Sequence, residues 1–190
     1  MLTFNAEKAG KADSGSYISQ GGVYTVRITR AECFSSPSGA GGIEFTFEDD
    51  DNGAKCDFVK VYTKNKDGSE NFAIGKIHAL MGLLELSKAE AKTTDGKTTI
   101  IDFVGKYISV ALRREEYPKS DNSIGYKFEV LHFFDAQTKQ TYRELIGKRD
   151  AKTCLVPIKD KYISGSDFGN SESYSQPAPI QQEPKEDLPF

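Results

Sequence analysis

Hydrophobic and polar residues alternate over several short stretches of the chain, with the period of two that is typical of half-buried β-strands. In one of them, Tyr24, Val26 and Ile28 alternate with polar residues. The same pattern predicts strands at residues 22–33, 43–48, 55–63, 106–114 and 124–134. Asn52-Gly53, between the second and third stretches, is the strongest short signal for a β-hairpin.

One stretch has a longer period. Between residues 70 and 86 the apolar side chains are spaced as on one face of a helix; they are Phe72, Ile77, Leu80, Met81 and Leu84. Three strands, a helix and two strands is the element order of the oligonucleotide-binding (OB) fold, which places its helix between strands three and four. We therefore predict a mainly β protein built on a five-stranded OB-fold barrel with one helix between strands three and four. A helical turn at 141–147 and an extended segment at 154–163 are expected to complete the ordered part.

Composition and charge divide the chain into three regions. Residues 1–21 are rich in Gly, Ser, Ala and Lys and predict an irregular N-terminal arm, residues 22–163 are the OB-fold body, and residues 164–190 predict a disordered acidic tail. The net charge is −3, from 25 basic and 28 acidic residues. The tail holds five of the acids and one lysine, which leaves 24 basic and 23 acidic residues before it. A nearly neutral body binds phosphates only if its cations gather on one face.

The last residues of the tail form a short docking motif. Glu186 and Asp187 are followed by Leu188, Pro189 and the C-terminal Phe190. An apolar pocket on a partner protein would take the Phe190 ring, while basic residues would bind the α-carboxylate and the two acids. We therefore predict that this tip recruits other proteins.

Binding of single strands without sequence preference needs cations for the phosphates and flat rings for the bases. Lys60, Tyr62 and Lys64 have the same parity on the third strand and are expected on one face, with Phe58 beside them. Arg113 and Arg114 end the fourth strand, and Tyr117 and Lys119 follow in a loop that flanks the binding groove in OB folds. We predict a groove lined by Lys60, Tyr62, Lys64, Arg113, Arg114, Tyr117 and Lys119. Arg27, Arg30 and Lys66 are further candidate cations.

Other functional motifs fail when their spacing is checked. The glycine-rich loop at 38–42 lacks the Gly-Lys-Ser/Thr ending of a phosphate-binding loop, and the acidic turn at 49–53 has Lys60 where an EF-hand requires glutamate. The three cysteines are isolated and predict neither a disulfide framework nor a zinc site. No arrangement suggests catalytic residues, a metal site or a cofactor. A signal peptide and a long apolar span are also absent from the sequence, so we expect an unexported, cytoplasmic protein with no membrane partner.

The tip resembles that of bacterial and phage single-stranded DNA-binding proteins, which end in acidic residues, an aliphatic residue, Pro and Phe. It differs in having Leu188 for the common isoleucine and only two consecutive acids. The body is similar to phage members of the family in short motifs: Gly22-Val23-Tyr24, Ser38-Gly39 before Gly42-Ile43-Glu44-Phe45, Val61-Tyr62-Thr63 with Lys66-Asp67-Gly68, and Gly105-Lys106. The resemblance implies a cofactor-free OB barrel that coats single strands in replication or recombination and recruits replication and repair proteins through its tip.

Two other functions stay open on the sequence. One is a phage structural or adaptor β-domain that does not bind nucleic acid. The other is a metal-dependent nuclease using Asp102, Glu115, Glu116 and Asp121, whose spacing does not call for a metal. The sequence also leaves open whether the chain forms homo-oligomers.

Overall fold

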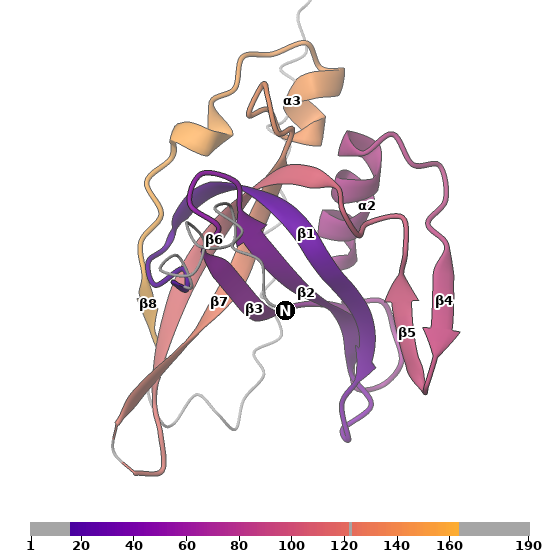
Figure 1. Cartoon of the computed structure of the whole chain (residues 1–190), viewed down its shortest axis with the longest axis vertical. Coiled ribbons are helices and arrows are strands. Elements are labelled where there is room, and N and C mark those ends of the chain that lie inside the picture. The colour runs from indigo at the N-terminus through magenta and orange to yellow at the C-terminus, as the bar shows by residue number, and fades with distance from the viewer. Residues whose placement is uncertain (1–15, 122, 164–190) are drawn as a thin grey trace, which may run out of the picture.

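A computed structural model describes residues 16–121 and 123–163 (Figure 1). The protein is mainly β, as predicted, with one open sheet of eight strands. The strands are β1 (Gly22–Ser35), β2 (Gly41–Asp49), β3 (Lys55–Lys64), β4 (Ala91–Thr94), β5 (Lys97–Ile100), β6 (Tyr107–Pro118), β7 (Ile124–Phe134) and β8 (Lys161–Tyr162). The helices are α2 (Ile74–Leu83), α3 (Tyr142–Ile146) and the short 3₁₀ helix η1 (Thr153–Leu155).

The long strand β1 organises the sheet. Its C-terminal part pairs with β2, and its N-terminal part, from Gly22 to Arg27, pairs with β6. β2 continues to β3, and β6 continues to β7, all antiparallel. β3 and β7 lie against each other, but no ladder joins them among the described residues, so the sheet is not closed.

Three strands were not predicted. β4 and β5 form a polar hairpin around Asp95-Gly96, attached to β1 where Glu32 pairs with Thr99, and β4 forms an edge of the sheet. Its residues are all exposed, so the hairpin lacks the hydrophobic alternation that identifies the other strands. β8 pairs in parallel with β6.

The hydrophobic core lies between the curved sheet and α2. Phe45 and Phe47 are fully buried and stack with ring centroids 5.5 Å apart, and α2 contributes Ile77 and Leu80. The helix is shorter than the predicted 70–86. It begins after a turn in which the Asn71 side chain accepts a hydrogen bond from the Ala73 amide. Beyond its end the chain changes direction at Glu85, whose φ is +56°.

The hairpin of β6 and β7 projects from the rest of the sheet at the lower left of Figure 1. β6 extends to Pro118, four residues beyond the predicted end of that strand, because its pairing with β7 continues to Ile124. Tyr117 therefore lies on a strand and not in the expected loop.

The segments flanking the sheet are held by a few backbone contacts. In the part of the predicted arm that the structure describes, Ile18 is buried in the core and its amide donates to the Lys55 carbonyl. The predicted tail, 164–190, with Glu186 to Phe190, lies outside the described residues, as do residues 1–15 of the arm. Within the described chain, none of the helices has the length and apolar character needed to cross a bilayer.

Candidate nucleic-acid interface

The outer face of β3 carries three of the residues predicted to bind nucleic acid. Lys60, Tyr62 and Lys64 are exposed, whereas Val59 and Val61, which alternate with them, are buried in the core. Successive residues of a strand point to opposite faces. The structure therefore brings these three side chains together on one solvent-facing surface.

The Tyr62 ring meets a second ring, Phe34 of β1, across the intervening strand β2. Their centroids are 5.2 Å apart and their planes are nearly perpendicular, at 86°. Gly42 pairs with both residues and lies between them. A Cβ at position 42 would lie 2.1 Å from the Val61 carbonyl oxygen, so only glycine fits here. The two rings form one aromatic surface across three strands.

Phe58 is a third ring on this face. It lies in a bulge of β3, opposite the stretch between Phe45 and Phe47, and is 69% exposed. Its φ is +59°, a left-handed conformation that costs a non-glycine residue about 1–2 kcal/mol. The Arg30 guanidinium lies 5.5 Å from the ring centroid. A strained, solvent-exposed aromatic residue is a sign of a binding role, since folding gains little from it.

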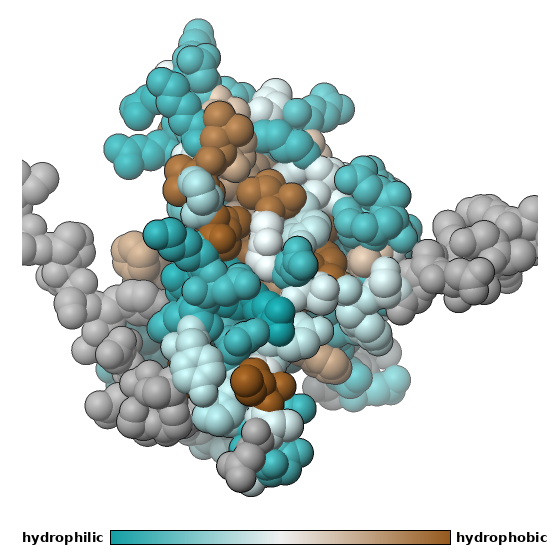
Figure 2. Space-filling model, turned by 90° about the vertical axis from the view of Figure 1, so that its left-hand side faces the viewer, coloured by the Kyte–Doolittle hydropathy of each residue, from teal (hydrophilic) through white to brown (hydrophobic). Residues whose placement is uncertain are grey.

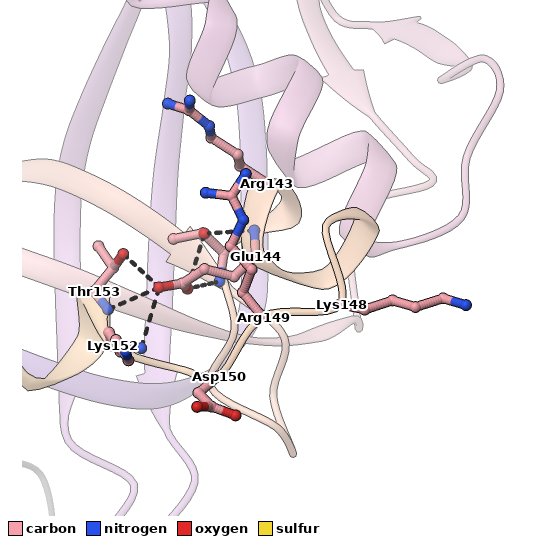
Figure 3. A pocket seen from close by; sticks show the side chains of 8 residues that line it. Arg143, Glu144, Lys148, Arg149, Asp150, Lys152 and Thr153 are labelled. Atoms are coloured by element: carbon pink, nitrogen blue, oxygen red, sulfur yellow. Dashed lines mark hydrogen bonds between the residues drawn. The ribbon is translucent and has the colours of Figure 1, made fainter.

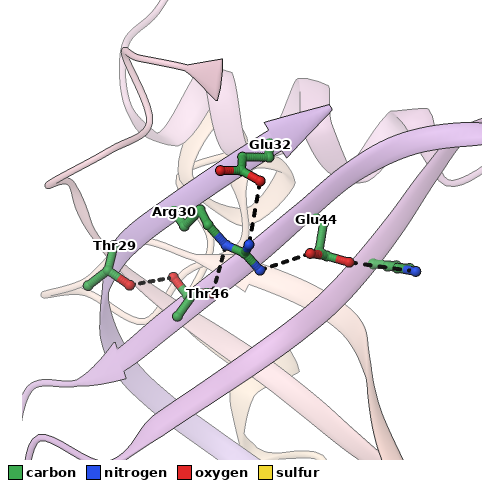
Figure 4. Close-up of polar contacts among 6 residues, drawn as sticks. Thr29, Arg30, Glu32, Glu44 and Thr46 are labelled. Atoms are coloured by element: carbon green, nitrogen blue, oxygen red, sulfur yellow. Dashed lines mark hydrogen bonds and ion pairs between the residues drawn. The ribbon is translucent and has the colours of Figure 1, made fainter. Parts of the chain in front are cut away.

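The charged residues between the rings neutralise each other (Figure 4). The Arg30 guanidinium contacts Glu44 at 2.8 Å and Glu32 at 3.4 Å, and its Nε donates to the Thr46 hydroxyl. The other oxygen of Glu44 lies 3.6 Å from Lys60 Nζ, which also sits 5.0 Å from the Phe34 ring centroid. Two cations therefore face two carboxylates, and this face is aromatic without being strongly positive.

We define these side chains as the aromatic face of the sheet: Arg30, Phe34, Glu44, Phe58, Lys60 and Tyr62. Sequence reasoning did not include Phe34, which lies just beyond the predicted strand end at Cys33. Continuing the alternation from Arg30 through Glu32 would have placed it on the same face.

Arg113 and Arg114 differ from their predicted arrangement. As neighbours on β6 they point to opposite faces of the sheet. Arg113 is paired with Glu129 and lies 3.6 Å from Glu115. Arg114 contacts Glu116 at 2.9 Å, and its guanidinium lies 4.6 Å from the Tyr126 ring centroid. Among the described contacts, none joins either arginine to Lys60 or Tyr62.

Tyr117 and Lys119 lie together at the end of the β6–β7 hairpin. The position that a Cβ at Gly125 would occupy is 2.9 Å from the Tyr117 ring and 2.9 Å from the Lys119 side chain. Both side chains thus pack across the glycine that pairs with Tyr117. The predicted residues form separate groups, one on β3 and the others along the hairpin.

The segment from 153 to 162 lies along β6 and β7, because its residues share a cleft with those strands and β8 pairs with β6. Figure 2 views this side of the molecule and shows hydrophobic side chains gathered below a hydrophilic top. A small apolar cleft of about 120 Å³ lies there, lined by Val23, Leu131, Val156 and neighbouring residues. This side of the sheet is therefore covered by the chain itself, whereas Lys60, Tyr62 and Lys64 on β3 are exposed.

Within the described residues, no group of three or more His, Cys, Asp or Glu side chains is arranged to hold a metal ion. The Asp102 carboxylate accepts a hydrogen bond from the Glu90 amide at 2.7 Å, and the Asp121 carboxylate accepts hydrogen bonds from the hydroxyl and the amide of Ser123. These two carboxylates thus have local structural partners. No model of a known protein family matches the chain, and a search of curated proteins finds no relative.

Proposed function

We propose that this chain is a single-stranded DNA-binding protein that coats unpaired strands in replication or recombination with little sequence preference. The observation that carries the proposal is the aromatic face, where the exposed rings of Phe58 and Tyr62 and the partly buried ring of Phe34 lie beside Arg30 and Lys60. Base stacking on such rings contributes about 1–3 kcal/mol per base and is tolerant of sequence.

The strand pairing supports an OB-type body. The path β3-β2-β1-β6-β7, with α2 between β3 and the later strands, is the arrangement expected of that fold, and β3 lies against β7 where an OB barrel would close. OB folds bind single strands on the face of their second and third strands, which is the aromatic face here. We propose that the hairpin β4–β5 and strand β8 are additions to this plan.

The spacing of the rings suits an extended strand. Phe34 contacts Tyr62, and Arg30 lies over the Phe58 ring. Because Phe34 and Arg30 are four residues apart on β1, the Phe34–Tyr62 pair and Phe58 are about 13 Å apart at 3.3 Å per residue. The row containing Glu44 and Lys60 lies between them. Since the cations there are already paired, we expect stacking to contribute more than phosphate contacts at this face, and the affinity of a strand bound to this face alone to fall only gently with salt.

Partner recruitment is a separate part of the proposal and rests on the sequence. The tip from Glu186 to Phe190 would dock replication and repair enzymes by its terminal ring and negative charge.

Fluorescence anisotropy with a labelled oligo-dT and a duplex control, across a salt series, tests the proposal. The wild-type chain should bind oligo-dT and prefer it to duplex. The double variant Phe58→Ala, Tyr62→Ala removes two stacking platforms and should weaken binding by about a hundredfold. Phe72→Ala is the matched control, because Phe72 is 88% exposed and lies outside the aromatic face; it should bind as wild type does.

Two results would contradict this function. One is a wild-type chain that does not bind oligo-dT or that binds duplex equally well. The other is an unchanged affinity in the Phe58/Tyr62 double variant, which would remove the aromatic face from the site.

A further inference from the structure

A second concentration of charge lies far along the chain from the aromatic face, around α3 and η1. A polar cavity of about 560 Å³ is lined there by Arg143, Lys148, Arg149 and Lys152, which we call the basic cluster (Figure 3). Sequence reasoning passed over these residues because they lie outside the strands of the expected barrel.

Ion pairing distinguishes the basic cluster from the cations of the sheet. Within the described residues, no carboxylate oxygen forms an ion pair with any of the four. Lys60, Arg113 and Arg114, by contrast, all have such partners. A cation without a partner carboxylate is free to bind an incoming anion without first breaking an ion pair.

Glu144 lines the same cavity, but its oxygens are committed to the protein. One oxygen accepts the amide and hydroxyl of Thr141, and the other accepts the Lys152 amide and both donors of Thr153. Burial acts to raise its pKa, but these hydrogen bonds outweigh it and lower the pKa to about 2. The ionised carboxylate thus ties α3 to η1, and both of its oxygens already accept hydrogen bonds from the protein.

The directions of the side chains indicate the shape of the ligand. In Figure 3, Lys148 points away from Arg143 and Arg149, and Asp150 points to the other side of the cavity from the two arginines. The cations therefore fan out and do not converge on one point. This arrangement fits a chain of anions better than a single small one.

We propose that the basic cluster binds backbone phosphates of the same nucleic acid strand that stacks on the aromatic face. The inference rests on the proposed function and extends it, because it assigns the phosphate contacts to a surface outside the sheet. Arginine suits this role since its planar fork binds phosphate oxygens in pairs. A strand long enough to reach the cluster would then bind more tightly, and with a steeper salt dependence, than a short one.

The test compares two four-residue variants in the full-length chain. The cluster variant is Arg143→Gln, Lys148→Gln, Arg149→Gln, Lys152→Gln. The control is Lys88→Gln, Lys92→Gln, Lys97→Gln, Lys106→Gln, which removes the same charge from exposed positions elsewhere. Binding is measured with oligo-dT probes of about 6 and about 30 nucleotides; the first is near the lower end of the roughly 4–16 nucleotides that an OB fold covers, and the second is well beyond it.

We expect the cluster variant to bind the short probe like the control and to lose at least tenfold in affinity for the long probe. Its slope of log affinity against log salt should become shallower by up to about 3, from 0.7 per lost phosphate contact on single strands. Equal binding of the long probe by the two variants, with equal slopes, would overturn the inference. The short probe reports on the aromatic face alone. If the wild-type chain binds neither the short nor the long probe, the proposed function itself fails; if it binds both but the two variants behave alike, only this inference fails.

Footprinting of the wild-type chain gives a second readout that does not depend on variants folding. Amine labelling of Lys148 and Lys152, followed by mass spectrometry, should be slowed by the long probe and not by the short one. Protection that is present without DNA, and lost in the variant Glu183→Gln, Glu186→Gln, Asp187→Asn, would assign the cluster to the acidic tail and overturn the inference.

Discussion

Replacing Glu144 with glutamine keeps the shape of the side chain and removes its charge. The carboxylate accepts five hydrogen bonds, from Thr141 at 2.8 and 2.9 Å, from Lys152 at 3.1 Å and from Thr153 at 2.9 and 2.7 Å. A glutamine amide has one oxygen and one NH₂ group, so donors on one side of it would face another donor. We expect Glu144→Gln to loosen the connection between α3 and η1.

The size of the effect follows from the pKa. The pKa of Glu144 falls from an ordinary 4.5 to about 2 in the folded chain. At 1.36 kcal/mol per pKa unit, this shift corresponds to about 3 kcal/mol of stability. Because the folded pKa is lowered, the contribution is fully present above pH 4.5 and is lost as the pH falls toward 2. The variant should therefore be less stable at pH 7 by about 2–3 kcal/mol, and the difference should shrink in acid.

Urea unfolding at pH 7, 4.5 and 3, with hydrogen exchange at the Thr153 amide as a local readout, measures this effect. Asp150→Asn is the control, since Asp150 lies in the same segment and should change stability by less than about 0.5 kcal/mol. Equal stability of the two variants at pH 7 would refute the reasoning, as would a difference that grows in acid.

Two further predictions concern the aromatic face. Gly42→Ala should lower the thermal midpoint by several degrees, because the added Cβ would lie 2.1 Å from the Val61 carbonyl oxygen. The control Gly75→Ala, in open space on α2, should raise or preserve the midpoint. Calorimetry that gives Gly75→Ala the lower midpoint would contradict the packing described. Phe58→Gly should be more stable than Phe58→Ala by about 1 kcal/mol in urea unfolding, because only glycine relieves the positive φ; equal stabilities would show that no strain is stored there.

The main strands could be predicted because each places one row of apolar side chains in the core. β4 and β5 could not, since their threonines and lysines, none of which is buried, give no alternation of polarity. The end of α2 depends on the left-handed backbone at Glu85, a residue that does not ordinarily signal such a turn.

The candidate site was predictable only within single strands. Parity placed Lys60, Tyr62 and Lys64 together on β3. The ring contact between Tyr62 and Phe34, and the pairing of Arg113 with Glu129, depend on which residues stand opposite each other. That register is shifted by bulges near Phe45 and Ala111, and local sequence does not determine where such bulges fall.

The open edge at β4 bears on how the protein behaves at high concentration. A free edge offers unpaired backbone groups that can template the growth of a sheet from one molecule to the next. β4 has four residues, includes Lys92 and carries no large apolar side chain. A strand this short and polar offers few backbone groups and little apolar surface for a strand of a neighbouring copy to pair with. Molecules at high concentration should therefore resist fibril formation at this edge.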